Sequence, residues 1–254
     1  MEAASRRHAL VTGGGRGIGR AIAASLAALG LKVSVVGRDE KTLEAVVAAG
    51  DAQNAIVADV TDRDAVRDAI ARAERDSEVD ILVNNVGGVE TGPFLRLDDD
   101  VFERQLALNL LSTVRVTRAV LPGMVERGFG RVINIASTAG LKAYPYASAY
   151  VAAKHAVLGF TRALALEMAK SGVTVNAICP GYTDTDLVRS SVERIGAKSG
   201  ASAKDVLAKL TAANPQGRLV HPQEVACVAA WLVSERAASV TGQAIAVDGG
   251  ETVS

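Results

Sequence analysis

The chain has 254 residues, 49% of them hydrophobic, and its 28 basic residues are balanced by 28 acidic ones. That length can bury one large α/β core, and zero formal net charge gives no electrostatic reason to expect nucleic acid or a membrane surface as partner. Two cysteines, Cys179 and Cys227, are too few for a disulfide framework. No stretch resembles a signal peptide or a membrane span, so we expect a soluble, cytoplasmic protein.

Short apolar runs rich in Val and Ile alternate with helical periodicity along the whole chain. The runs predict buried strands at residues 9–12, 32–36, 55–58, 79–84, 131–136, 173–178 and 243–247. The helical pattern lies at residues 17–28, 42–49, 63–75, 101–125, 150–170 and 222–233. This alternation predicts a Rossmann-type, doubly wound α/β fold: a seven-stranded parallel sheet with helices on both faces, in a single domain over residues 1–254.

One segment breaks the alternation. About 30 residues, from Thr183 to Asn214, contain helical patches but no strand. The segment follows the carboxyl end of a strand, where open α/β sheets bind their ligands. A long insertion at that place predicts a substrate lid at about residues 183–214, with a plain linker as the alternative.

A glycine-rich turn, TGGGRGIG at residues 12–19, joins the first predicted strand to the first helix. Glycines allow a tight turn and close approach to a diphosphate, which then lies on the free N–H groups of the helix. The alternative is a tight strand–helix connection without a ligand. In this context the turn predicts a dinucleotide site. Its cofactor-binding residues are Gly13, Gly15, Arg16, Gly17, Ile18 and Gly19.

The residues after the second strand bear on which dinucleotide binds. An NAD site usually has an acidic side chain there, whereas this chain has Gly37 and Arg38. Arg38 and Arg16 could together hold a 2′-phosphate, so NADP(H) is favoured and NAD(H) remains possible. The alternative is that both are solvated surface arginines.

A tyrosine and a lysine four residues apart, Tyr150 and Lys154, share one face of a predicted helix. Ser137 precedes them at the carboxyl end of a strand. We expect the ammonium of Lys154 to lower the pKa of Tyr150, which would deliver or remove a proton while Ser137 donates a hydrogen bond to a substrate carbonyl. A surface Tyr–Lys contact is the alternative.

Taken together, these motifs resemble the short-chain dehydrogenase/reductase family over essentially the whole chain. Besides the residues above they include Asp59-Val60, the NNVG segment at residues 84–87, Asn109, Pro180-Gly181 and Asp248-Gly249-Gly250. The resemblance implies a catalytic set of Asn109, Ser137, Tyr150 and Lys154, in which Asn109 binds a water that relays protons. It also implies a homotetramer.

The resemblance extends to individual cofactor contacts. Asp59 and Val60 would hold the adenine, Asn85 and Gly87 would line the cleft, and Lys154 would grip the nicotinamide ribose together with Tyr150. The residues implied for the carboxamide end are Pro180, Gly181, Thr183 and Thr185.

Substrate identity is less determined. The sequence resembles both reductases of 3-oxoacyl thioesters and 3-hydroxybutyrate dehydrogenases. The latter place a lysine where this chain has Ala147, and a free carboxylate without a cationic partner is costly to bury. We therefore expect NADPH-dependent reduction of a 3-oxoacyl thioester or related ketone, with an NAD-dependent 3-hydroxybutyrate dehydrogenase or other secondary-alcohol dehydrogenase as the alternative.

Four residues are expected to form the wall of the substrate pocket: Tyr144, Tyr146, Tyr182 and Leu187. Lys142, Arg189 and Arg194 lie in segments expected near the cleft mouth, where they would either meet a pantetheine or nucleotide phosphate or remain solvated. The three histidines lack ligand spacing, so no metal is expected. A regulator that binds the cofactor without chemistry is a further alternative, disfavoured by the intact catalytic set.

Overall fold

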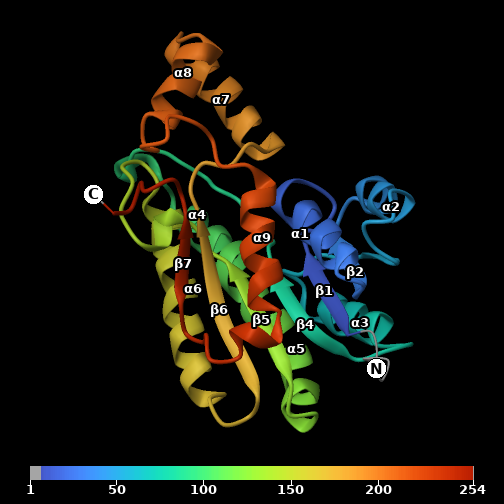
Figure 1. Cartoon of the computed structure of the whole chain (residues 1–254). Coiled ribbons are helices and arrows are strands. Elements are labelled where there is room, and N and C mark those ends of the chain that lie inside the picture. The colour runs from blue at the N-terminus through green and yellow to red at the C-terminus, as the bar shows by residue number, and fades with distance from the viewer. Residues whose placement is uncertain (1–6, 254) are drawn as a thin grey trace.

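Parallel pairing joins the strands into one sheet. A computed structural model describes residues 7–253, except for the side chains of residues 187, 194, 198 and 199. In this range the strands are β1 (His8–Thr12), β2 (Lys32–Gly37), β3 (Asn54–Val57), β4 (Val79–Asn84), β5 (Gly130–Ile135), β6 (Val173–Pro180) and β7 (Ala244–Val247). Their order is β3-β2-β1-β4-β5-β6-β7, all parallel, which confirms the predicted doubly wound sheet (Figure 1).

Helices cover both faces of this sheet. One face carries α1 (Gly17–Ala28), α2 (Glu40–Ala48) and α9 (Pro222–Leu232). The other face carries α3 (Arg63–Ala73), α5 (Ser112–Glu126) and α6 (Ser148–Glu167). The apolar strands are therefore buried on both sides, as a parallel sheet requires.

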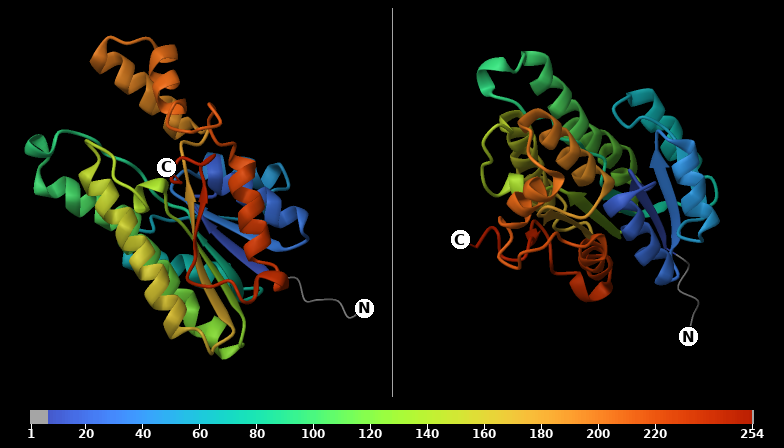
Figure 2. Two further views of the ribbon diagram at one scale, coloured as in Figure 1. Left: turned by 60° about the vertical axis from the view of Figure 1, so that its left-hand side comes forward. Right: turned by 90° about the horizontal axis from the view of Figure 1, so that it is seen from above.

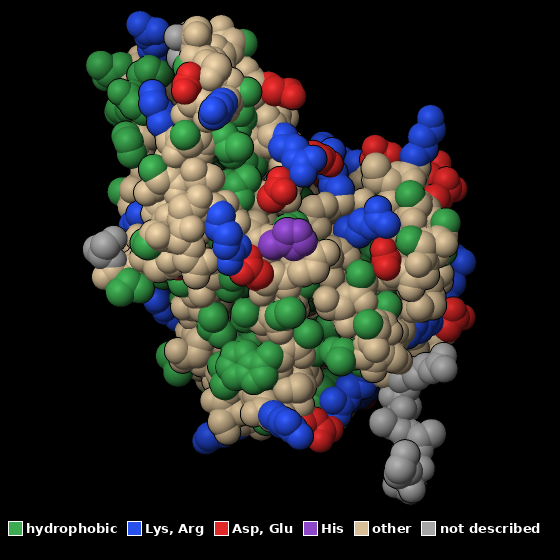
Figure 3. Space-filling view, turned by 45° about the horizontal axis from the view of Figure 1, so that its top comes forward, with side chains coloured by type: hydrophobic (Ala, Val, Ile, Leu, Met, Phe, Trp, Pro, Cys, Tyr) green, Lys and Arg blue, Asp and Glu red, His purple; other side chains and the backbone are tan. Residues whose placement is uncertain are grey.

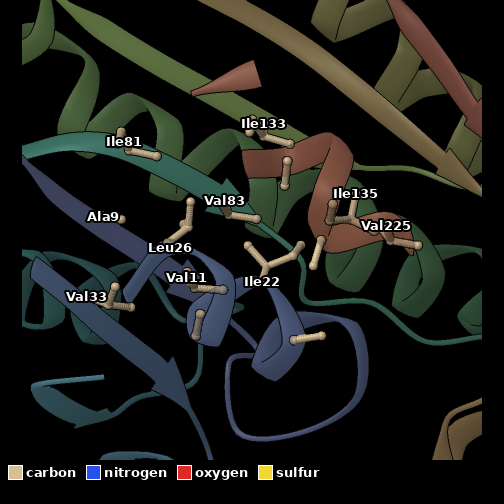
Figure 4. Packing of buried hydrophobic residues seen from close by; sticks show 14 of the residues in the cluster. Ala9, Val11, Ile22, Leu26, Val33, Ile81, Val83, Ile133, Ile135 and Val225 are labelled. Atoms are coloured by element: carbon tan, nitrogen blue, oxygen red, sulfur yellow. The ribbon is translucent and has the colours of Figure 1, made fainter. Parts of the chain in front are cut away.

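The core on the α1 face shows why these segments fold as they do. Ile22 and Leu26, four residues apart, project from one side of α1 and are fully buried with Val11 and Val83 of the sheet (Figure 4). Val225 adds a side chain from α9. Full burial of each such side chain contributes about 1.5–3 kcal/mol, so this contact fixes α1 and the turn before it against the sheet.

Strand order places a crevice at the carboxyl edge of the sheet. The chain runs outward from β1 to β2 and β3, then returns to pair β4 on the other side of β1. Connections leave in opposite directions at this point, and open α/β sheets bind ligands there. The turn after β1 and the ends of β4, β5 and β6 all meet at this edge.

The single helix predicted at 101–125 is interrupted. The structure has α4 (Asp99–Leu106), a π-helical segment at Ala107–Leu111 and then α5. A π turn is a single-turn feature inside a continuous helix, so the spacing of apolar residues over the whole segment does not reveal it. The interruption carries Asn109.

The predicted lid segment forms two helices that extend from the carboxyl edge. They are α7 (Asp186–Ser199) and α8 (Ala203–Thr211), and Gly200 ends α7 with a φ of 72°. At their base a bridge pairs Thr183 with Val220. Figure 2 shows this helix pair standing away from the layered body.

Among residues 7–253, no helix combines the length and hydrophobicity needed to cross a bilayer. Cys179 is buried and Cys227 is exposed, both as free thiols. On the face shown in Figure 3, basic and acidic side chains are interspersed rather than separated by sign. This face therefore carries charges of both signs, as expected from the equal numbers of basic and acidic residues.

Candidate active site

Two positions in the turn after β1 have backbone conformations that favour glycine. Gly13 has a φ of +64° and Gly17 a φ of +54°. The Gly13 N–H donates to the Val36 carbonyl oxygen at 2.7 Å, which anchors the turn to β2. A Cβ on Gly19 would lie 2.3 Å from the Gly13 carbonyl oxygen, so α1 packs against the turn more closely than any side chain would permit.

The first turn of α1 suits an anion. Arg16 is the N-cap residue, and its side chain makes no capping hydrogen bond. The N–H groups at the start of a helix have no intrahelical partner and lie at the positive end of the helix dipole. The tight turn and the uncapped helix end fit a dinucleotide diphosphate. Arg16 is exposed here, while Ile18 packs partly against the core.

Arg38 and Asp59, the residues expected at the adenine end, lie together after β2 and β3. Arg38 is 75% exposed, and its Nη1 is 3.9 Å from Asp59 Oδ2. Asp59 Oδ1 accepts hydrogen bonds from the Thr61 N–H at 2.9 Å and its hydroxyl at 2.8 Å. Burial acts to raise the pKa of Asp59, but the Thr61 hydrogen bonds and the Arg38 charge together lower it. Asp59 therefore stays ionised and holds Arg38 beside the site.

Two residues expected to face the cofactor have other contacts. The Val60 side chain is buried with Leu10 and Val36, so it belongs to the core and only its backbone can face the crevice. Asn85 Nδ2 donates to the Thr12 and Gly13 carbonyl oxygens, each at 3.1 Å. Asn85 thus ties the end of β4 to the glycine-rich turn instead of presenting its amide to a ligand.

Ser137, Tyr150 and Lys154 meet at the carboxyl end of β5. A hydrogen bond joins Ser137 and Tyr150. Ser137 Oγ also accepts from the Ala139 N–H at 3.1 Å. Lys154 is 4% exposed, and its Nζ donates to the Ile135 carbonyl oxygen at 2.9 Å. The strand end and the first turns of α6 thus fix a hydroxyl, a phenol and an ammonium in one cluster.

The expected lowering of the Tyr150 pKa by Lys154 is not found. Burial raises the pKa of Tyr150, and the hydrogen bond with Ser137 only partly offsets this. Lys154 Nζ lies 5.8 Å from the centre of the Tyr150 ring. Burial also lowers the pKa of Lys154 to about 8. Removal from water is the largest cause of both shifts, so Tyr150 is a neutral phenol, able to donate a proton.

Asn109 is buried in the π-helical segment and closes the site from the side of β4. Its Nδ2 donates to the Gly88 carbonyl oxygen at 3.0 Å and its Oδ1 accepts from the Gly88 N–H at 3.1 Å. A further hydrogen bond runs from Nδ2 to Gln105 Oε1 at 3.2 Å. A Cβ on Gly87 would lie 2.9 Å from Asn109 Oδ1 and 3.4 Å from Lys154 Nζ, so Gly87 brings these two side chains to one surface.

Residues after β6 continue the crevice toward α7. Pro180 ends the strand and is buried, and the Gly181 N–H donates to the Val247 carbonyl oxygen at 3.0 Å. Thr183 is buried and its hydroxyl donates back to the Gly181 carbonyl oxygen at 3.0 Å. Thr185 reaches the glycine-rich turn, because its methyl group would lie 3.1 Å from a Cβ on Gly17.

The expected pocket residues separate into two groups. The rings of Tyr144 and Tyr182 pack edge to face, with centroids 6.3 Å apart. Tyr146 is instead 66% exposed, with a φ of 65°, and its carbonyl oxygen accepts from the Gly92 N–H. It lies at the rim and is not part of the Tyr144–Tyr182 pair. The side chain of Leu187 lies outside the described part of the chain.

Sequence reasoning missed three contributors. Gln105 holds Asn109 and could have been found from its i, i+4 spacing. Thr138 follows Ser137 and has its hydroxyl 2.7 Å from the Tyr144 hydroxyl. Glu251, 1% exposed, contacts Tyr144 across 107 positions, for which the sequence carries no local signal.

The fold and the site define a dinucleotide-dependent oxidoreductase, with a glycine-rich turn beside a Ser–Tyr–Lys cluster. The family model for short chain dehydrogenases matches residues 7–196. The chain belongs to the short-chain dehydrogenase family, which confirms the resemblance seen in its sequence.

Individual relatives cover nearly the whole chain. A Streptomyces coelicolor protein provisionally named as a ketoacyl reductase is 42% identical over 251 residues, covering 95% of each chain. D-beta-hydroxybutyrate dehydrogenase of Cupriavidus necator is 40% identical over 248 residues, covering 95% of this chain and 96% of that one. Among solved structures, an actinorhodin polyketide ketoreductase variant with NADPH superposes with a TM-score of 0.94 at 39% identity, covering 99% of both chains.

Proposed function

We propose that this protein reduces a ketone to a secondary alcohol with NADPH, and that its substrate is a neutral 3-oxoacyl thioester or a related ketone. The observation that carries the proposal is the cluster of Ser137, Tyr150 and Lys154, which stands beside the glycine-rich turn. The names of the ketoacyl reductase and ketoreductase relatives support the reaction class.

The chain's own groups perform the proton chemistry of this reaction. A bound nicotinamide coenzyme supplies the hydride to the carbonyl carbon. Without a substrate, the Ser137 hydroxyl hydrogen-bonds with Tyr150. A substrate carbonyl oxygen bound between the two side chains would accept the Ser137 proton in place of the phenol. Tyr150 keeps its proton at neutral pH because burial raises its pKa, and it donates that proton to the same oxygen.

Lys154 and Asn109 support Tyr150. One N–H of the Lys154 ammonium is fixed on the Ile135 carbonyl, and its remaining N–H groups can donate to the ribose of a bound cofactor. Its charge stabilises the phenolate that forms as Tyr150 gives up its proton. Asn109, adjoining the same surface, takes the role of holding a water that restores the proton.

NADPH is favoured over NADH by Arg38 and Arg16. Both are exposed arginines at the adenine end, and Asp59 keeps Arg38 there. A guanidinium fork matches a 2′-phosphate in charge and shape. The solved ketoreductase that contains NADPH adds independent support.

The alternative is an NAD-dependent 3-hydroxybutyrate dehydrogenase, which the Cupriavidus relative favours. Ala147, buried at the start of α6, offers no charge to a free carboxylate. Burying a carboxylate without a cationic partner costs on the order of several kcal/mol of binding free energy. We therefore place the neutral substrate first.

Three further parts of the proposal concern the whole chain. The helices α7 and α8 act as the substrate lid of a single-domain enzyme. The protein assembles as a homotetramer, since exposed leucines stand on α4 to α6. It works in the cytoplasm, where its free thiols Cys179 and Cys227 remain reduced.

The test is the rate of NADPH and of NADH oxidation with acetoacetyl-CoA and with free acetoacetate. Wild type is expected to prefer NADPH with the thioester, and Tyr150→Phe is expected to lose at least about 100-fold in rate. Cofactor titration establishes that the variant is folded. Retention of more than about a tenth of the rate would refute the mechanism. A preference for NADH with acetoacetate would replace this proposal with the dehydrogenase.

A further inference from the structure

The last residues of the chain return to the substrate wall. Figures 1 and 2 show the C-terminal end at the same edge of the sheet as the α7–α8 pair. After β7, Asp248 Oδ1 accepts from the Gly250 N–H at 2.9 Å, and Oδ2 accepts from the Thr252 N–H at 2.9 Å and its hydroxyl at 2.6 Å. This turn fixes the chain on both sides of Glu251.

Glu251 is a buried carboxylate whose partners include Tyr144 and Lys142, beside the expected substrate wall. It is 1% exposed and accepts a hydrogen bond from the Tyr144 hydroxyl. Because a carboxylate can only accept, Tyr144 uses its single proton here and accepts from the Thr138 hydroxyl at 2.7 Å. Glu251 therefore orients Tyr144, which packs on Tyr182 next to the Ser137 loop.

The second partner is the ammonium of Lys142. Lys142 Nζ lies 3.2 Å from Glu251 Oε1, donates to the Glu251 carbonyl oxygen at 3.2 Å, and stands 5.3 Å from the centre of the Tyr144 ring. Lys142 is 37% exposed, so the ammonium borders both the tyrosine wall and solvent. Without Glu251 this position would present a full positive charge to a ligand.

We propose that Glu251 is a specificity-determining residue that neutralises Lys142 and so selects neutral ketones over anionic 3-oxo acids. The inference rests on the proposed ketone reduction and adds the reason for its substrate class. Glu251 acts through Lys142 and Tyr144, and is not itself a catalytic residue. Its effect falls on the ratio of kcat/KM for an anionic 3-oxo acid to kcat/KM for its neutral ester.

The experiment compares kcat/KM for acetoacetate with kcat/KM for its neutral ethyl ester, using NADPH. In Glu251→Gln the amide oxygen still accepts from Tyr144, but the charge of Lys142 is uncompensated. The anionic-to-neutral ratio should rise by about tenfold or more, as expected for one charge-assisted contact to the carboxylate. The double variant Lys142→Gln/Glu251→Gln should return the ratio to that of wild type.

Glu235→Gln is the matched control. It also removes one carboxylate from an ion pair, here the exposed Glu235 with Arg7 near the start of β1, and should leave the ratio unchanged. An unchanged ratio in Glu251→Gln would overturn the inference, because a purely structural role would lower kcat/KM for both substrates by the same factor.

Two further outcomes are also decisive. If Glu251→Gln fails to fold, Lys142→Gln decides: it removes the ammonium but keeps the Glu251 carboxylate, so the ratio should fall by about tenfold, and an unchanged ratio would overturn the inference. If wild type reduces neither ketone, the proposed function fails and the inference with it. If the ester is reduced but the ratio is the same in wild type and in the variants, the inference is overturned and the proposed function stands.

Discussion

Lys154 is almost fully buried, and its ammonium is fixed on the Ile135 carbonyl. Burial brings the pKa of this lysine to about 8, while it moves the pKa of Tyr150 upward. Both shifts disfavour the charged form of the group, as desolvation predicts. At neutral pH the pair is thus a phenol beside an ammonium, the state needed to donate a proton to a ketone.

This assignment predicts a pH dependence. Lys154 is charged below its pKa and neutral above it, so kcat/KM for ketone reduction should fall as the pH rises through about 8. Rates from about pH 7 to about pH 10 test this, with melting temperatures recorded at each pH to exclude unfolding. A flat profile over this range would contradict the role of the ammonium.

Arg38 gives a second prediction at a single residue. Arg38→Ala removes the guanidinium expected on the 2′-phosphate but leaves the diphosphate site intact. The kcat/KM ratio of NADPH to NADH should fall by about 10–100-fold, the effect of losing one or two charge-assisted hydrogen bonds. Arg20→Ala is the matched control, since Arg20 is an exposed α1 arginine paired with Asp51. The contact between Arg38 and the 2′-phosphate would be refuted if Arg38→Ala and Arg20→Ala had the same NADPH-to-NADH ratio of kcat/KM.

At the scale of elements, the site depends on how closely α1 approaches the turn before it. The contact is set by the burial of Ile22 and Leu26 on one side and by the absence of a side chain at Gly19 on the other. The π-helical segment Ala107–Leu111 acts similarly on the far side, where it places Asn109 against Gly88. Packing of whole helices thus sets the geometry of the cofactor surface.

Gly19→Ala tests this packing. The new methyl group would lie 2.3 Å from the Gly13 carbonyl oxygen, a backbone atom, so the helix or the turn must move. Overpacking of this kind costs about 1–3 kcal/mol, which predicts a lower melting temperature and NADPH binding weakened by about fivefold or more. In the control Gly159→Ala no described atom beyond the neighbouring helix backbone lies within 4 Å of the new methyl group, and helix stability should rise by up to about 1 kcal/mol. Unchanged cofactor affinity in Gly19→Ala would contradict the argument.

At the scale of the whole molecule, apolar side chains remain on the surface of the α4–α6 layer. Leu166 of α6 is 81% exposed, and Leu111 and Val125 are also exposed. Exposed apolar groups that lie on adjoining helices are typical of protein interfaces. They support the proposed homotetramer.

Light scattering after gel filtration measures the assembly. Wild type should have four times the chain mass of 26.2 kDa. Leu166→Glu should shift the protein toward smaller species without lowering the stability of the monomer, because this side chain is exposed within the chain. A monomeric wild type would refute the assembly, and a Leu166→Glu tetramer would exclude this residue from the interface.

The sequence by itself determined the features that depend on local pattern. Apolar runs and helical spacing predicted the sheet and most helices. The TGGGRGIG turn and the Tyr150–Lys154 spacing indicated the cofactor turn and the reacting groups that we propose. These signals are local because a strand, a helix and a glycine turn each follow from neighbouring residues. The family relationship followed from the same motifs.

Only the tertiary structure decided what depends on burial and on contacts between distant segments. Burial raises the pKa of Tyr150, where the charge of Lys154 alone predicted a lowering. The Val60 side chain is buried in the core, and Tyr146 is exposed at the rim of the crevice. It also joined Glu251 to Tyr144 across 107 positions. Desolvation and long-range packing exist only after the sheet has assembled, so no pattern of neighbouring residues encodes them.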